Sequence, residues 1–287
     1  MPLPKIAMLG LGGAAELIEG RGAVGSVRMT DKLAILDGDV MDAAQAQIPV
    51  TDEGLLRGDG VFEVVRLYNG APYGLEEHLE RMARSAATLR LEFDIDAVRD
   101  DAEKLLEMTE PADGALRLLV TRGGRRIGLV EDLPRIPDTV ALATITYSPT
   151  RVLDGVKSLS YAANMLASRV AREQGADEAL LVTPHGRVLE GPTTSFFYVL
   201  DGALYTPPLE DRILDSITRR ALFAVTDAAE RITTLDDLRG VSEAFLASSA
   251  REVQPVRAID DITVPSAPGP VSLDAAARVG EYIEARL

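Results

Sequence analysis

Chemistry that needs a primary amine has few candidates in this chain, because only four residues are lysines: Lys5, Lys32, Lys104 and Lys157. A lysine taken by itself is most often a solvated surface residue. Lys157 lies in a different setting, since between residues 152 and 169 the only other charged residues are Asp154 and Arg169. A setting of low polarity lowers the pKa of an amine, so Lys157 suits acid–base or nucleophilic chemistry.

Composition excludes several other kinds of site. The 287 residues include no cysteine and only two histidines, which excludes thiolate nucleophiles, cysteine-bound zinc and three-histidine metal sites. A net charge of −15 argues against binding to nucleic acid or to anionic lipid. No apolar run approaches the roughly 18–20 residues of a membrane span, and the start lacks the layout of a signal peptide. We therefore expect a soluble cytoplasmic protein.

Two segments have features of anion binding. Residues 10–13 hold glycines, but the third glycine of a dinucleotide fingerprint is misplaced, so we favour an irregular N-terminal arm over residues 1–32. Ser216-Ile217-Thr218 opens a predicted helix, whose free N–H groups form an anion site. A dinucleotide-binding enzyme stays as an alternative, and it predicts a preparation that binds dinucleotide.

Hydrophobic patterns predict an α+β fold in two parts. Strands are expected at 61–68, 116–121, 139–146, 178–182, 187–189, 195–200, 203–205 and 244–248. Helices are expected at 75–91, 95–110, 164–174, 216–226 and 273–286. Hairpins mixed with helices, without strict β–α alternation, indicate α+β. With a linker near Ser148, the organisation is a small α+β domain at 33–147 and a larger domain at 148–287.

Six motifs occur in a fixed order: Gly58–Glu63, Glu77–Arg81, Lys157–Leu159, Asp177–Gly191, Tyr205–Leu209 and Ile217–Arg219. The series, over about residues 33–287, resembles the class IV aminotransferases. These are the fold-type IV pyridoxal-phosphate enzymes, which include branched-chain and D-amino-acid aminotransferases and aminodeoxychorismate lyases. The resemblance implies a small α+β domain, a larger pseudo-barrel domain, pyridoxal 5′-phosphate between them, and a homodimer.

The resemblance also assigns roles to residues. Lys157 matches the lysine that forms a Schiff base with the cofactor and then acts as acid and base at the substrate α-carbon. Glu190 matches the carboxylate that pairs with the pyridine nitrogen. The remaining cofactor-binding residues are expected to be Arg81, Thr194, Ile217, Thr218 and Ser249. Ser195 stands where the family often has Asn, and Ser216 where it usually has Gly.

Substrate contacts are less clearly indicated. Phe62 aligns with a Tyr or Phe that faces the active site in the family. The loop 122–128 contains glycines and can be mobile, so we expect Arg125 or Arg126 to bind a substrate carboxylate, with Arg57 in reserve. The alternative, which has almost equal support, is that these arginines are solvated in a turn and do not bind substrate. His78 is expected to be structural, and His185 receives no role.

The resemblance favours transfer of an amino group between an amino acid, of D-amino-acid or branched-chain type, and a 2-keto acid. An aminodeoxychorismate lyase that releases pyruvate to give 4-aminobenzoate is the alternative, because the segment 121–126 is closer to the lyases. A protein of this fold that has lost its cofactor is the third hypothesis, and it predicts a colourless preparation. Which amino donor and acceptor are used does not follow from the sequence.

Overall fold

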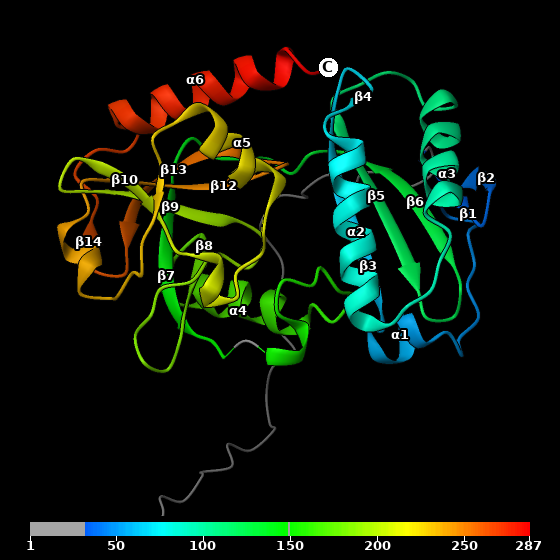
Figure 1. The fold of residues 1–287 in the computed structure, drawn as a ribbon, viewed down its shortest axis with the longest axis horizontal. Helices are drawn as coiled ribbons and strands as arrows, with labels where there is room; N and C mark the ends of the chain where they lie inside the picture. The colour runs from blue at the N-terminus through cyan, green and yellow to red at the C-terminus, as the bar shows by residue number, and fades with distance from the viewer. Residues whose placement is uncertain (1–31, 149) are drawn as a thin grey trace, which may run out of the picture.

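The polypeptide forms two lobes, each built on its own sheet (Figure 1). The computed structural model describes residues 32–148 and 150–287, so the predicted arm and its glycines at 10–13 lie outside the described residues, apart from Lys32. The N-terminal lobe holds β1–β6 with α1–α3, and the C-terminal lobe holds β7–β14 with α4–α6. The predicted α+β class is confirmed. None of the helices in these ranges is long and apolar enough to cross a membrane.

Among the described residues, the N-terminal sheet has six antiparallel strands in the order β2-β1-β6-β5-β3-β4. Asn69 and Gly70 join β3 to β4 as predicted, and both have the positive φ (46° and 85°) that a tight hairpin turn requires. The bounds are β1 Leu33–Leu36, β2 Asp39–Asp42, β3 Gly60–Tyr68, β4 Ala71–Pro72, β5 Gly114–Thr121 and β6 Arg126–Glu131. The strand β6 was not predicted, because its first residues were assigned to a loop.

Two long helices pack on this sheet, after the short α1 (Glu53–Arg57). In α2 (Leu75–Leu89) the predicted stripe faces inward, and Leu79 and Met82 pack with Val61 and Leu116 in one core. Helix α3 (Ile95–Glu107) is capped by Asp94, whose carboxylate accepts hydrogen bonds from Asp96 N and Ala97 N. The packing of α2 matters for the site, because its buried face also carries His78 and Arg81.

The C-terminal sheet has the order β11-β10-β9-β12-β13-β7-β8 among the described residues, with β14 paired to β13. Irregular segments connect the two ends of the sheet through Val188. Val188 forms a β-bridge with Val182, the last residue of β8, and its N donates to Thr233 O, shortly after β11. The sheet therefore nearly closes, as the predicted pseudo-barrel requires. The strand bounds are β7 Val140–Thr146, β8 Glu178–Val182, β9 Ser195–Leu200, β10 Ala203–Thr206, β11 Ala229–Glu230, β12 Glu243–Ser248, β13 Glu252–Ile259 and β14 Ile262–Thr263.

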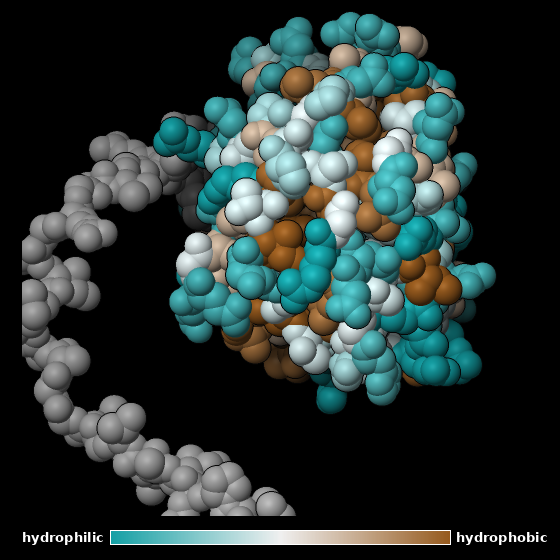
Figure 2. All heavy atoms as spheres, turned by 90° about the vertical axis from the view of Figure 1, so that its left-hand side faces the viewer, coloured by the Kyte–Doolittle hydropathy of each residue, from teal (hydrophilic) through white to brown (hydrophobic). Residues whose placement is uncertain are grey.

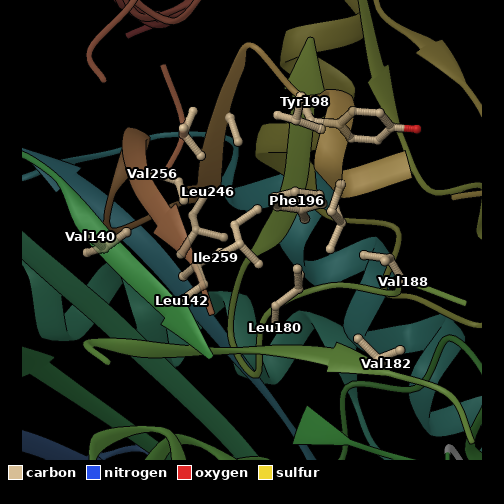
Figure 3. Packing of buried hydrophobic residues seen from close by; sticks show 14 of the residues in the cluster. Val140, Leu142, Leu180, Val182, Val188, Phe196, Tyr198, Leu246, Val256 and Ile259 are labelled. Atoms are coloured by element: carbon tan, nitrogen blue, oxygen red, sulfur yellow. The ribbon is translucent and has the colours of Figure 1, made fainter. Parts of the chain in front are cut away.

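Side chains from five strands of this sheet point toward one another and fill its interior, as Figure 3 shows for Leu142, Leu180, Phe196 and Leu246. The helices α4 (Ala162–Glu173), α5 (Ile217–Val225) and α6 (Pro270–Glu284) pack outside the sheet. On the face of this lobe that is turned away from the other lobe, mostly hydrophilic side chains surround smaller hydrophobic areas (Figure 2).

Strand β7 belongs to the C-terminal sheet, where it runs parallel to both β8 and β13. Residues 139–146 were expected in the small domain, because they precede the predicted linker near Ser148. By sheet membership, the change of lobe falls between β6 and β7 instead, in residues 132–139. The domain bounds 33–147 and 148–287 stay a prediction.

Candidate active site

A cavity of about 510 Å³ lies between the two lobes, and residues of both lobes line it. The N-terminal lobe contributes Phe62, Arg81 and Arg117. The C-terminal lobe contributes Lys157 and Glu190, and its lining also includes Thr194 and Ser249. Residues that are about 190 positions apart in the sequence are thus collected around one space.

The backbone of residues 157–159 pairs with the start of β3, and this pairing fixes the position of Lys157. Phe62 N donates a hydrogen bond of 3.1 Å to Lys157 O, and Leu159 N donates one of 2.9 Å to Gly60 O. A Cβ on Gly60 would lie 2.4 Å from Val120 O and 2.6 Å from the Leu159 side chain, so only glycine fits at this crossing. The hydrogen bonds between residues 157–159 and β3 therefore join the two lobes at the backbone of the lysine.

The Lys157 amine lies against two aromatic rings inside the cavity. Its Nζ is 4.3 Å from the centre of the Phe62 ring and 5.8 Å from that of Tyr161, and the two rings meet edge to face. Burial lowers the pKa of Lys157 to about 8. At pH 7 roughly a tenth of this amine is therefore unprotonated, far more than for an ordinary lysine. The sparse charge of residues 152–169 predicts such a lowered pKa.

Glu190 reaches the cavity from the segment that follows β8. Leu189 N donates to Leu181 O, Leu181 N donates to Glu190 O, and the Glu190 carboxylate accepts a hydrogen bond of 3.0 Å from Leu214 N. Burial raises the pKa of Glu190 to about 8. Within residues 32–148 and 150–287 it forms no ion pair, so the cavity contains a carboxylate that lacks a cationic partner.

Two hydroxyl groups beside Glu190 have no partner among the described residues. Thr194 and Ser195 are only 4% and 1% exposed, and neither Thr194 Oγ1 nor Ser195 Oγ forms a hydrogen bond. They follow a tight turn in which a Cβ on Gly191 would lie 2.2 Å from Thr194 Oγ1. Buried polar groups are almost always paired, so these two hydroxyls, which line one cavity, are available to bind a polar ligand.

Arg81 is held by a buried carboxylate that was not predicted as a site residue. Its Nε donates to Glu63 Oε1 (2.8 Å) and its Nη2 to Glu63 Oε2 (2.5 Å), while His78 Nδ1 lies 2.7 Å from the same Oε2. Burial alone would raise the pKa of Glu63, but Arg81 and His78 lower it to about 2. His78 is buried and outside the cavity lining, in keeping with the structural role expected for it.

Replacing Glu63 by Gln should destabilise the fold by about 3–5 kcal/mol at pH 7, because Arg81 would keep a buried charge without a counter-charge. The pKa of Glu63 is depressed, so its stabilisation is present above pH 4.5 and is lost as the pH falls through about 2. Urea unfolding at several pH values measures this difference. The control Glu76→Gln removes a largely exposed partner of Arg99 and should change stability much less. Equal effects of the two variants would contradict the assignment.

Arg81 also reaches the start of α5. Its Nη1 donates to Asp215 O (3.2 Å), and the next residue, Ser216, caps α5 by accepting a hydrogen bond from Arg219 N. Ile217 and Thr218 form the first turn; their side chains are buried outside the cavity lining, so only their backbone N–H groups are candidates for a ligand there. A buried guanidinium beside a helix N-terminus is a setting that binds anions.

The structure does not bring Arg125, Arg126 or Arg57 to the cavity of the same chain. Arg125 pairs with Asp37, Arg126 pairs with Asp101, and Arg57 is exposed at the end of α1 beside Glu53. The preceding Arg122 binds Asp59 and two backbone carbonyls. Ion pairs therefore hold the turn that was expected to be mobile, and the carboxylate-binding role given to these arginines stays a prediction.

Other charged residues that were not predicted do line the cavity: Arg117, Glu131, Asp132, Asp154, Arg212 and Arg251. Arg117 lies on β5, and its guanidinium is 5.8 Å from the centre of the Phe62 ring. Side chains alternate between the two faces of a strand, so Arg117 shares a face of β5 with Ala115 and Leu119. This alternation is the signal in the sequence that could have grouped the three residues. The alternation does not show whether this face lines the cavity, because the neighbouring strand β6 was not predicted.

Comparisons with known proteins agree with this geometry. A family model described as amino-transferase class IV matches residues 60–259. A Methanocaldococcus jannaschii protein with a provisional name as branched-chain-amino-acid aminotransferase is 34% identical over 78% of this chain and 87% of its own. The D-alanine aminotransferase of Bacillus licheniformis is 30% identical over 83% and 92%. A hypothetical aminotransferase from Mycobacterium tuberculosis, in a PLP-bound form, superposes with a TM-score of 0.80 at 27% identity over 89% and 99%.

Proposed function

The chain belongs to the class IV aminotransferases, and from this premise we propose that Lys157 is its reactive amine. The protein is a pyridoxal-phosphate-dependent aminotransferase, acting on amino acid and 2-keto acid substrates. The lyase alternative is not favoured, because the similar proteins are named as aminotransferases. The hypotheses of a dinucleotide-binding enzyme and of a protein without cofactor lose their support for the same reason.

The residues of the cavity fit pyridoxal 5′-phosphate. Glu190 offers a buried carboxylate without a cation, which suits a protonated ring nitrogen. Thr194 and Ser195 offer two unpaired hydroxyls beside it. Arg81, together with the N-terminus of α5, offers positive potential for a phosphate, and Ser249 adds a hydroxyl to the lining.

The single observation that carries the proposal is that one cavity contains an amine with a lowered pKa and a carboxylate with a raised pKa. The bound cofactor supplies an aldehyde for the amine and a ring that accepts electrons from the substrate α-carbon. Lys157 Nζ would take the proton from the α-carbon of the donor and pass it to the carbon of the former aldehyde, and with the keto acid acceptor it would move a proton in the opposite direction. A pKa near 8 is well matched to this role at neutral pH. Phe62 and Tyr161 exclude water from this amine.

The other residues position the cofactor and stabilise its charged groups. Glu190 keeps a proton on the ring nitrogen, and Leu214 N–H holds the carboxylate in place. Arg81 binds the phosphate and is itself oriented by Glu63 from β3. Because desolvation strengthens these interactions, a small number of charges can hold the cofactor within a chain of net charge −15.

For the substrate carboxylate we propose Arg117, since it lines the cavity that Arg125 and Arg126 do not reach. Much of the remaining lining is apolar, including Val64, Leu153 and Met165. An amino acid with an apolar side chain, of D-amino-acid or branched-chain type, fits this composition. The relatives support both types, since one is named as a branched-chain-amino-acid aminotransferase and another as a D-alanine aminotransferase.

The proposal is tested by incubating the purified, cofactor-loaded protein with single amino acids in the D- and L-forms, with pyruvate as the acceptor. We expect a yellow protein that forms alanine from apolar donors. Formation of 4-aminobenzoate from aminodeoxychorismate, without amino transfer in the panel, would contradict it.

We also propose a homodimer in the cytoplasm. Large apolar side chains are exposed on the described part of the chain, including Leu55 and Leu56 on α1, and a second copy could cover them. Sedimentation should give about twice the chain mass of 30.7 kDa, and a monomer at micromolar concentration would contradict the proposal. Fractionation of source cells tests the location.

A further inference from the structure

A carboxylate occupies one edge of the Arg117 guanidinium inside the cavity. Glu131, on the neighbouring strand β6, accepts hydrogen bonds from Arg117 Nε at 2.9 Å and 3.0 Å, and its Oε2 is 2.8 Å from Nη2. The two side chains are 32% and 35% exposed, and both line the cavity. The pair therefore lies where an entering substrate meets it and is not buried under the sheet.

The Arg117–Glu131 pair lies near the reactive amine. Arg117 and Lys157 both approach the ring of Phe62, at 5.8 Å and 4.3 Å from its centre. A substrate whose α-carbon is next to Lys157 is thus within reach of Arg117. A charged group beside Arg117, such as Glu131, therefore also acts on the part of the substrate that binds to Arg117.

One substrate carboxylate can still form hydrogen bonds to Arg117, but the negative charge beside Arg117 disfavours a second. Glu131 occupies the Nε–Nη2 edge, whereas the described residues give Nη1 no hydrogen-bond partner, so a carboxylate can still bind at the outer edge. With Glu131 in place, the Arg117–Glu131 pair carries no net charge, so a second substrate carboxylate would lie near Glu131 with no excess positive charge to balance it. Asp132, also in the lining, is a further carboxylate, and among the described residues it pairs with Lys32.

We propose that Glu131 determines specificity: it allows substrates with one carboxylate and disfavours those that carry a second carboxylate on the side chain. The inference rests on the proposed function, because it takes the cavity as the amino-acid site. Like-charge repulsion against a competing ligand is a common way to obtain selectivity. Glu131 acts through Arg117 and on the substrate, and it takes no part in proton transfer.

The test compares two inert acids of equal length, glutarate and pentanoate, by calorimetric titration of the cofactor-loaded protein. The measured quantity is the ratio of their dissociation constants. Glu131→Gln should shift this ratio in favour of glutarate by about tenfold, the order of effect of one unit charge at short range near a protein surface. Glu131→Asp, which keeps the charge, should stay near the wild-type ratio.

The matched control is Asp132→Asn, which removes the same charge from the next residue. Asp132 is 71% exposed and paired with Lys32, so its removal should shift the ratio less than about twofold. An unchanged ratio in Glu131→Gln, an equal loss of both acids, or an equal shift in the Asp132 control would overturn the inference.

Failure of the proposed function has a different signature. Binding of the two acids does not require turnover, so the ratio can be measured even if no donor in the panel is accepted. An inactive wild-type protein whose ratio still shifts in Glu131→Gln contradicts the proposed function alone. An active enzyme whose ratio does not shift contradicts the role of Glu131 alone.

Discussion

Lys157→Ala should abolish transamination and leave the fold intact. Among the described lysines, Lys157 alone lines the cavity, and the variant removes both the attachment point and the base at the α-carbon. We expect turnover to fall by more than about 10³-fold, with unchanged circular dichroism, because the backbone bonds of residue 157 to Phe62 and Ser85 do not involve its side chain. Steady-state kinetics and the visible spectrum measure the two parts of this result.

The control for this variant is Lys104→Ala. Lys104 lies on α3 and donates to Gly38 O, outside the cavity lining, so the variant should keep the wild-type spectrum and turnover. A Lys157→Ala protein that still turns over at a rate close to the wild type would show that the amine is not the reactive group.

Glu190→Gln should keep the cofactor and lose most of the turnover, by about 10²-fold. The amide can still accept the hydrogen bond from Leu214 N, but it supplies no charge to keep the ring nitrogen protonated. Single-turnover absorbance with a good donor measures the chemical step, and equilibrium dialysis measures retention of the cofactor.

Glu190→Asp is the matched variant, because it keeps the charge and shortens the side chain. It should recover more of the chemical step than Glu190→Gln does. Equal rates for the two variants would mean that the position of the side chain matters and its charge does not, which is incompatible with the proposed role.

The sequence was sufficient for features that depend on local pattern. The stripe of Leu79 and Met82 predicts α2 and its buried face, and Asn69-Gly70 predicts the turn after β3. The ordered motifs around Lys157 and Glu190 predict two residues that the fold does bring to one cavity.

Features that depend on pairing between distant strands could not be predicted. Arg126 begins β6 and binds Asp101 on α3, so a residue expected to bind substrate pairs with another part of its own lobe. The same missed strand carries Glu131, and without it neither the Arg117–Glu131 pair nor the cavity face of β5 is visible in the sequence. Glu63 belongs to a recognised motif, but only packing of α2 on β3 shows that it holds Arg81.

The central claim is that Lys157 bonds covalently to the cofactor. Reduction of the cofactor-loaded protein with borohydride fixes such a bond, and mass spectrometry of the digested peptides then locates the added group. We expect the label on the peptide that contains Lys157, with none on peptides that contain Lys32 or Lys104. A label on Lys5, Lys32 or Lys104, with Lys157 unmodified, would contradict it.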